Sequence, residues 1–326
     1  MKQKYLFYCI INPIIAIIGI CGNSACLVVY SKYWSKDSTF EYQIVIAIVD
    51  LVSVSAKLIH WMSSWWIAPY HPQGRAWVKE YPFMIWGKQH LSGFIRFGAD
   101  SLLPLLTITM CVNRACALYC PLLYRNGLRK AVLCVGLLFA FSIAFSVNSM
   151  EMFRVVVING TSLRSPIDQT VIPSEVISMS VRCRNAISIL SIVMVSGLNF
   201  CIFRKYRKVI KIAANSQNKD FKLKEERLKM TLLLVQSGLV VFGQLPLAVD
   251  FYIQYAYPER AFGLLHDLAT LGITMEASLN FIAYAGTSQW FRAAAMNTLN
   301  PCKCTDKTDI VVISSGANDT NHPVTS

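Results

Sequence analysis

The sequence predicts an all-α membrane protein in which seven helices cross the bilayer and the N-terminus lies outside. Of its 326 residues, 54% are hydrophobic and 15% are charged, and the mean hydropathy is +0.44. Soluble domains carry about 25% charged residues, so this composition favours a membrane protein. A helix needs about 20 apolar residues to cross a bilayer core of about 30 Å. The sequence contains seven apolar runs of about that length.

The predicted membrane helices lie, in order, at residues 6–30, 42–65, 91–118, 131–150, 185–203, 230–255 and 265–287. An amphipathic stretch at 288–300 predicts a short helix on the membrane surface. The sequence has no internal repeat and no sign of a second domain. We therefore expect one domain over 1–304 and a flexible cytoplasmic tail over 305–326.

The distribution of basic residues predicts the orientation, because cytoplasmic segments of membrane proteins retain Lys and Arg. With the N-terminus outside, the inner segments hold 19 of the 31 basic residues and the outer segments hold 10, while Lys57 and Arg96 lie inside helices. The segment 204–229 decides the orientation, since it alone carries ten of them. A cleaved signal peptide is the alternative for the first apolar run, but the run's length favours a signal anchor.

Two kinds of covalent modification are predicted. Asn159 begins an Asn-Gly-Thr acceptor for N-glycosylation in an outer loop. Cys302 and Cys304 follow the amphipathic stretch and fit palmitoylation, with plain free thiols as an equally supported alternative. Most of the other cysteines fall within predicted helices without a CxxC pair, which favours packing over metal or redox chemistry.

The third predicted helix carries Asn113-Arg114 near its cytoplasmic end, and Tyr119 and Pro121 follow in the next segment. A guanidinium at the cytoplasmic mouth of a helix bundle can hold a resting state through local polar partners. It can then be exposed to a partner protein when the helices separate. The alternative is that Arg114 only anchors its helix at the cytoplasmic surface.

Single polar residues within other predicted helices accompany Arg114. Asn23 lies in the first helix, Asp50 in the second, and Asn280 and Tyr284 in the seventh, while Pro246 interrupts the sixth. A carboxylate in the middle of a membrane helix costs about 2.5–3.5 kcal/mol, so it normally faces the bundle and has a partner. These residues therefore predict a polar interior between the helices.

Together, these motifs resemble the rhodopsin-like G-protein-coupled receptors. The Asn-Arg form in "NRACALYCPLLY" is most similar to the nematode serpentine chemoreceptors of the Srg superfamily, which includes the Srv, Srx, Srg and Srt classes. The resemblance implies a multi-pass receptor of the plasma membrane or sensory cilium that contacts lipids and a heterotrimeric G protein, and neither an enzyme nor a nucleic-acid-binding protein. It also implies roles in activation and coupling for Asn113, Arg114, Tyr119, Pro121, Pro246, Asn280 and Tyr284.

Several positions depart from the family's pattern. Asn113 stands where an acid usually precedes the arginine, Phe281 replaces the proline of the Asn-Pro-x-x-Tyr motif, and Gln244 replaces a tryptophan. Gln89 occupies the position of the common outer cysteine, so the standard disulfide to the second outer loop, whose only cysteine is Cys183, is not expected.

Glu276 lies one turn before Asn280, and we expect it to face Asp50 across the bundle. Two carboxylates in such proximity favour a shared proton or a bound cation such as sodium. The alternative is a hydrogen bond from Glu276 to the hydroxyl of Thr274 or Ser278. No other cofactor is expected.

The predicted ligand site centres on Arg96, which lies five turns outward of Arg114 on the same helix face. A cation there favours carboxylates or neutral acceptors over amines. Asp100 is spaced to pair with Arg96, and Lys57 lies two turns from Asp50 on one face. The predicted ligand contacts are Arg96, Asp100, Lys57, Phe97, Phe94, Asp250 and Tyr252. Alternatively, Arg96 with Asp100 and Lys57 with Asp267 are internal pairs that never contact a ligand.

A small-molecule or ion transporter is the chief alternative function, with the buried charges forming a relay or substrate path. The sequence lacks the repeats typical of transporters. It also lacks HExxH and GxSxG motifs, which argues against a membrane enzyme. Residues 265–287 contain no lysine that could hold retinal, and the segment before the first helix is short. We therefore expect a small acidic or neutral ligand.

Overall fold

The computed structural model describes residues 10–32, 38–66, 91–124, 128–149, 156–158, 161–163, 174–214, 220–256, 263–287 and 289–299. Within these ranges the helices are α2 (Asn12–Ser31), α3 (Ser38–Trp66), α6 (Ser92–Tyr119), α7 (Pro121–Leu123), α8 (Arg129–Asn148), α9 (Ser174–Ala214), α10 (Asp220–Ala256), α11 (Gly263–Ser278), α12 (Asn280–Thr287) and α13 (Gln289–Leu299). Six of them, α2, α3, α6, α8, α9 and α10, are long and apolar enough to cross a membrane. The protein is therefore α-helical with the character of a multi-pass membrane protein.

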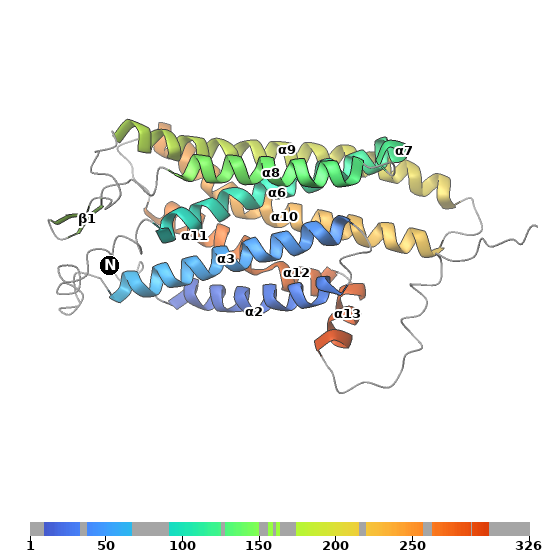
Figure 1. The fold of residues 1–326 in the computed structure, drawn as a ribbon, viewed down its shortest axis with the longest axis horizontal. Helices are drawn as coiled ribbons and strands as arrows, with labels where there is room; N and C mark the ends of the chain where they lie inside the picture. The colour runs from blue at the N-terminus through green and yellow to red at the C-terminus, as the bar shows by residue number, and fades with distance from the viewer. Residues whose placement is uncertain are drawn as a thin grey trace, which may run out of the picture.

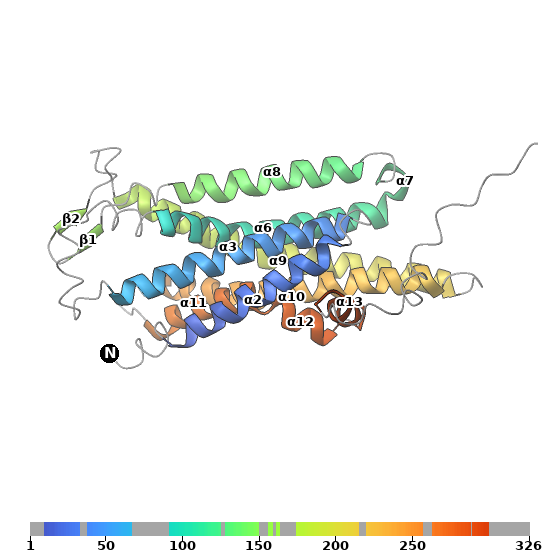
Figure 2. The ribbon, with the colours of Figure 1, turned by 60° about the horizontal axis from the view of Figure 1, so that its bottom comes forward.

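The long helices run side by side along the longest axis of the molecule (Figures 1 and 2). Contacts close them into a ring in the order α2, α3, α6, α9, α10 and α11, which packs back against α2. Helix α6 also contacts α8 and α10, so it lies near the centre, whereas α8 packs mainly on α6 at the periphery. The start of α2 lies at one end of the bundle, and α7, α13 and the facing ends of α9 and α10 lie at the other (Figure 1).

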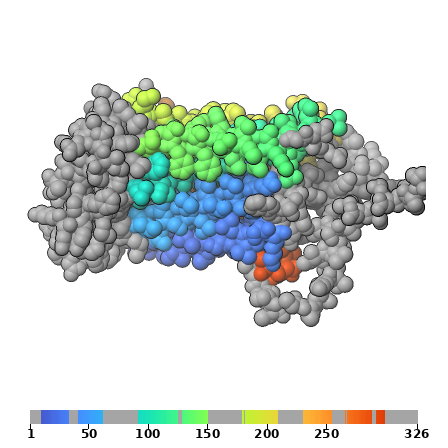
Figure 3. Space-filling model, viewed as in Figure 1, coloured from blue at the N-terminus to red at the C-terminus, as the bar shows by residue number. Residues whose placement is uncertain are grey.

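The apolar core follows the inner face of α6. Its fully buried side chains include Leu102, Leu106 and Met110, which pack with Ile46 of α3 and Val195 of α9 in one cluster. Around the outside, large apolar side chains are exposed, such as those of α2 and α8, which lie on the side of the molecule shown in Figure 3. A continuous apolar outer surface is what lipid chains require of a membrane-embedded bundle.

The helix bounds differ from the sequence prediction mainly at the charged ends. Helix α9 covers Ser174–Ala214 instead of 185–203, and α10 begins at Asp220 instead of 230. Hydropathy marks only the apolar part of a helix, whereas Lys, Arg, Glu and Ala continue the helix beyond it because their helix propensity is high. The first helix begins at Asn12, and residues 6–9 of the predicted span lie outside the described residues.

The predicted seventh helix is divided in two. Helix α11 ends at Ser278 and α12 begins at Asn280, so Leu279 interrupts the regular helix. Backbone hydrogen bonds from Leu279 N to Met275 O (2.9 Å) and from Ala283 N to Leu279 O (2.8 Å) still cross the interruption. The expectation of one continuous helix over 265–287 was wrong in this respect.

The expectation of an all-α chain also needs a small correction. Strands β1 (Val156–Ile158) and β2 (Thr161–Leu163) form an antiparallel hairpin at the end of the bundle where α2 begins (Figure 1). An Asn-Gly dipeptide between two short β-branched runs is a strong hairpin signal, and residues 159–160 carry it. The same dipeptide was interpreted only as part of a glycosylation acceptor.

Glycines allow α10 and α11 to approach closely. A Cβ added at Gly243 would lie 2.6 Å from Glu276 Cβ, and one added at Gly272 would lie 3.1 Å from Gly243 O. On the other side of α11, a Cβ at Gly19 would lie 2.8 Å from Ser278 Cβ. Small residues at helix crossings permit this contact in membrane proteins, and here they place the polar residues of α11 between α2 and α10.

Candidate functional site

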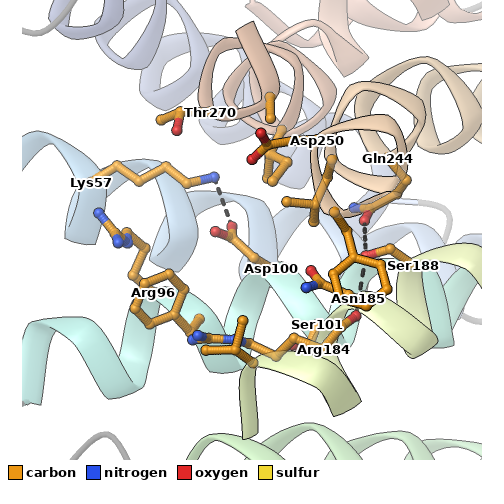
Figure 4. Close-up of a pocket in the computed structure, with 16 residues that line it drawn as sticks. Lys57, Arg96, Asp100, Ser101, Arg184, Asn185, Ser188, Gln244, Asp250 and Thr270 are labelled. Carbon is orange, nitrogen blue, oxygen red and sulfur yellow. Dashed lines mark hydrogen bonds and ion pairs between the residues drawn. The ribbon is translucent and has the colours of Figure 1, made fainter. Parts of the chain in front are cut away.

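A pocket of about 450 Å³ opens near the end of the bundle where α2 begins, between α3, α6, α9, α10 and α11. Its charged residues are Lys57, Arg96, Asp100, Arg184 and Asp250 (Figure 4). Apolar side chains, among them those of Leu247, Phe251 and Ile273, complete the lining. Ten of the sixteen lining residues are polar or charged. A cavity of this size with converging polar groups is typical of a small-molecule site, and here the polar share of the lining is high.

Lys57 of α3 forms an ion pair with Asp100 in the pocket. Its Nζ lies 2.7 Å from Asp100 Oδ1, and the Lys57 and Asp100 side chains are 2% and 14% exposed. Ser53 Oγ donates a hydrogen bond to the same Asp100 oxygen at 2.8 Å. Asp100 therefore pairs with α3, and the expected partnership with Arg96 on its own helix was wrong, because the cation across the helix interface reaches its carboxylate directly.

Arg96 and Arg184 both lie against the ring of Phe97. Their guanidinium carbons are 4.2 Å and 4.0 Å from the ring centroid, within the range of a cation–π contact. Arg184 Nη1 also lies 3.5 Å from Asn148 Oδ1 of α8, and Asn148 in turn donates to Ser101 Oγ at 3.0 Å. Two cations from different helices are thus held at one wall of the pocket (Figure 4).

The floor of the pocket is a hydrogen-bonded series across three helices. Ser188 Oγ of α9 donates to Gln244 Oε1 of α10 at 2.8 Å, and Gln244 Nε2 donates to Glu276 Oε2 of α11 at 2.9 Å. Glu276 is buried, and its partner is neither Thr274 nor Ser278, whose hydroxyls were the expected alternatives. Gln244 takes this place because Gly243, its neighbour, lets α10 approach Glu276 closely.

Deeper in the bundle, Asp50 and Asn23 bind α11 and α12. Asn280 Nδ2 donates to Asp50 Oδ2, and Asn23 Nδ2 donates to Ala277 O at 2.7 Å. Both side chains are fully buried, as the sequence predicted for polar residues in these helices. Asp50 bonds Asn280, whereas Glu276 bonds Gln244, so each carboxylate has an amide partner of its own.

Tyr284 of α12 continues this polar interior. Its hydroxyl oxygen lies 2.6 Å from Gln43 Oε1 of α3 and 2.6 Å from Gln236 Oε1 of α10. A phenol has one proton, so one amide accepts it and the other turns its N–H group to the phenolic oxygen. Glu276, Asn280 and Tyr284 thus follow one another at four-residue intervals, and each joins α11 or α12 to a neighbouring helix.

The Asn113-Arg114 pair lies at the far end of α6, where both side chains are buried. Asn113 Oδ1 accepts a hydrogen bond of 3.1 Å from the hydroxyl of Tyr124, beyond α7. Pro121 begins α7, and the half-exposed Tyr119 donates to Cys201 O of α9 at 3.2 Å. This end of α6 is therefore tied to the following turn and to α9.

Not every predicted ligand contact lines the pocket. Lys57, Arg96, Phe97, Asp100 and Asp250 do so. Phe94 instead packs against Phe145 of α8, with ring centroids 5.4 Å apart, and Tyr252 is 67% exposed on the outer side of α10. Which face each of these side chains presents depends on how the helices pack, and the sequence alone does not show that.

A comparison with protein-family models and with curated proteins finds no match to this chain. The resemblance to serpentine receptors therefore rests on the motifs themselves.

Arg184 lines the pocket but was not predicted from the sequence. The predicted fifth helix started at 185, which left Arg184 in a loop, whereas α9 begins at Ser174 and carries Arg184 into the pocket. Gln43 and Gln236 were missed as well, because neither belongs to a recognised motif and neither carries a charge.

Asn159, Cys302 and Cys304 lie outside the described residues. Among the described residues, Cys183 is a free thiol. Among the described residues, no group of three or more His, Cys, Asp or Glu side chains is placed to hold a metal ion. The buried oxygens without a hydrogen-bond partner among the described residues include Asp50 Oδ1, Asn23 Oδ1, Ser278 Oγ and Asn280 Oδ1, and Asn280 bonds Asp50 directly.

Proposed function

We propose that this protein is a G-protein-coupled chemosensory receptor of the plasma membrane. In this proposal α11 and α12 together form the seventh membrane span, the N-terminus is outside, and a small acidic or neutral ligand binds in the pocket. The bound receptor activates a heterotrimeric G protein at the opposite end of the bundle. Cys302 and Cys304 are proposed palmitoylation sites beyond α13, which would lie on the membrane surface.

The observation that supports this proposal most is the polar series on α11 and α12. Glu276 bonds a glutamine that lines the pocket, Asn280 bonds Asp50, and Tyr284 bonds Gln43 and Gln236. A ligand that moves Gln244 therefore acts on the same helix pair that holds α3 and α10 together deeper in the bundle. Buried polar contacts with two discrete arrangements are the kind of element that a ligand can bias.

A sodium ion near Asp50 is part of the same proposal. Hard cations take oxygen ligands, and the four buried oxygens without a hydrogen-bond partner would supply a carboxylate, two amide carbonyls and a hydroxyl. Buried waters would satisfy the same atoms if no cation binds.

Coupling is tested by replacing Arg114 with alanine. We expect at least a tenfold lower rate of receptor-driven nucleotide exchange on purified heterotrimeric G proteins, because a buried cation at the cytoplasmic mouth is lost; tenfold corresponds to about 1.4 kcal/mol. The matched control is Arg129→Ala, at the same end of the bundle in a partly exposed pair with Glu41. If the wild type drives no exchange on any class of Gα subunit, a transporter becomes the better interpretation.

Topology is tested separately by glycosylation mapping in microsomes. We expect a glycan on Asn159 that disappears in Asn159→Gln, and no change in Asn318→Gln, because Asn318 begins an acceptor in the proposed cytoplasmic tail. A glycan on Asn318 alone would reverse the orientation and remove the basic segment 204–229 from the cytoplasm.

A further inference from the structure

We propose that the pocket binds a small carboxylic acid whose carboxylate is held by Arg96, Arg184 and Lys57. This inference rests on the proposed function, because it takes the pocket to be the receptor's ligand site. It goes further by naming the chemical class of the ligand and by assigning Arg184 of α9 as an anchor. Charge, preorganisation and shape each support it.

The charges of the pocket do not cancel. Three basic and two acidic side chains line it, namely Lys57, Arg96 and Arg184 against Asp100 and Asp250. Asp100 already has Lys57 Nζ at 2.7 Å and the Ser53 hydroxyl at 2.8 Å. The formal charge of the lining is therefore +1. A positive lining favours an anionic ligand over a cationic one.

The two arginines are held in advance of binding. Both guanidinium groups lie within 4.2 Å of the Phe97 centroid, and Arg184 is also fixed by Asn148. A guanidinium stacked on an aromatic ring presents its N–H groups at its edge, in the fork that suits a carboxylate. Preorganised donors lose little side-chain entropy on binding, which favours tight recognition by a small ligand.

Lys57 of α3 supplies a third donor to the pocket. Its side chain is only 2% exposed, and among the described residues its single ion pair is with one Asp100 oxygen. An ammonium has three N–H donors, and Nζ makes no hydrogen bond of good geometry to the described residues. Figure 4 shows this amine directed into the pocket from α3. A ligand carboxylate would accept hydrogen bonds from the Lys57 N–H donors that Asp100 leaves unused.

The rest of the pocket fits an apolar remainder of limited size. Leu247, Phe251, Ala269 and Ile273 of α10 and α11 contribute apolar side chains to the lining. A volume of about 450 Å³ is at the small end of the range for ligand sites, roughly 300–1,000 Å³. Acids with a short aliphatic chain or one ring are therefore the expected ligands.

The test measures thermal unfolding of the full-length protein in lipid nanodiscs with butanoate, hexanoate and benzoate. Each acid is compared with the matched alcohol and the matched primary amine at equal concentration. We expect saturating acid to raise the Tm by about 3 °C and the alcohols and amines to raise it far less. In Arg96→Gln and in Arg184→Gln, the acid concentration for half the effect should rise roughly tenfold or more, whereas Arg129→Gln should leave it unchanged.

The Tm without ligand shows whether each variant is folded. Arg184→Lys keeps the positive charge but removes the planar guanidinium with its paired N–H donors. The proposal is overturned if no acid shifts the Tm, if alcohols or amines shift it equally, or if the arginine variants respond like the wild type. Binding is measured without a G protein, so the acidic ligand and the receptor function can be refuted independently. Acid binding without nucleotide exchange would refute the receptor function but not the acidic ligand. Nucleotide exchange driven only by neutral or amine ligands would refute the acidic ligand but not the receptor function.

Discussion

Replacing Lys57 with methionine is expected to lower the free energy of unfolding by about 3–5 kcal/mol and the Tm by roughly 10 °C. The change removes the cation from Asp100 and leaves a nearly buried carboxylate with only the Ser53 hydroxyl. An uncompensated charge in the bundle costs far more than the lost packing, since methionine keeps most of the lysine's volume. Thermal unfolding of the purified protein in nanodiscs measures the effect.

One rescue variant and one control variant test this explanation. Lys57→Met combined with Asp100→Asn should recover most of the lost stability, because the second change removes the unpaired charge. Arg129→Gln breaks an ion pair of 3.4 Å whose side chains are 35% and 26% exposed, and it should cost no more than about 1 kcal/mol. Equal losses in Lys57→Met and in the double variant would show that Asp100 does not depend on Lys57.

Replacing Gly243 with alanine is expected to destabilise the protein by about 1–3 kcal/mol through overpacking. The added Cβ would lie 2.6 Å from Glu276 Cβ and 3.1 Å from Glu276 Cδ, so α10 and α11 must separate or Glu276 must leave Gln244. Thermal unfolding reports the destabilisation. A weakened ligand response in the same variant would report the loss of the Gln244–Glu276 hydrogen bond.

The matched control for this change is Gly238→Ala, on the same helix. An added Cβ at Gly238 meets no heavy atom within 4 Å. Alanine should therefore raise stability there by up to about 1 kcal/mol, because it has the higher helix propensity. A gain in stability at both positions would mean that the close approach of α10 and α11 does not constrain residue 243.

Much of the fold followed from hydropathy, because a membrane helix must be apolar over about 20 residues whatever its neighbours are. The same property could not place the ends of α9, where Arg and Lys continue the helix, nor the division at Leu279, which falls within an apolar run. The hairpin β1–β2 had a recognisable Asn-Gly signal.

The candidate site was predictable only one helix at a time. Spacing placed Lys57, Arg96 and Asp100 on inward faces, but a spacing rule relates residues of the same helix. The choice between Arg96 and Lys57 as the partner of Asp100 depends on how α3 packs against α6, and no motif encodes that. Likewise, Gln43 and Gln236 become significant only when Tyr284 lies between them.

The polar contacts of α11 and α12 also have a consequence for biosynthesis. Asn23, Asp50 and Gln244 lie in helices that are synthesised earlier, yet their partners Ala277, Asn280 and Glu276 emerge last from the ribosome. Until the final helices arrive, the first ones hold amides and a carboxylate that lack these partners within the bilayer, each at a cost of several kcal/mol. A chain truncated before residue 263 would therefore insert but remain a substrate for membrane quality control, whereas one that loses only the tail after 304 would mature normally.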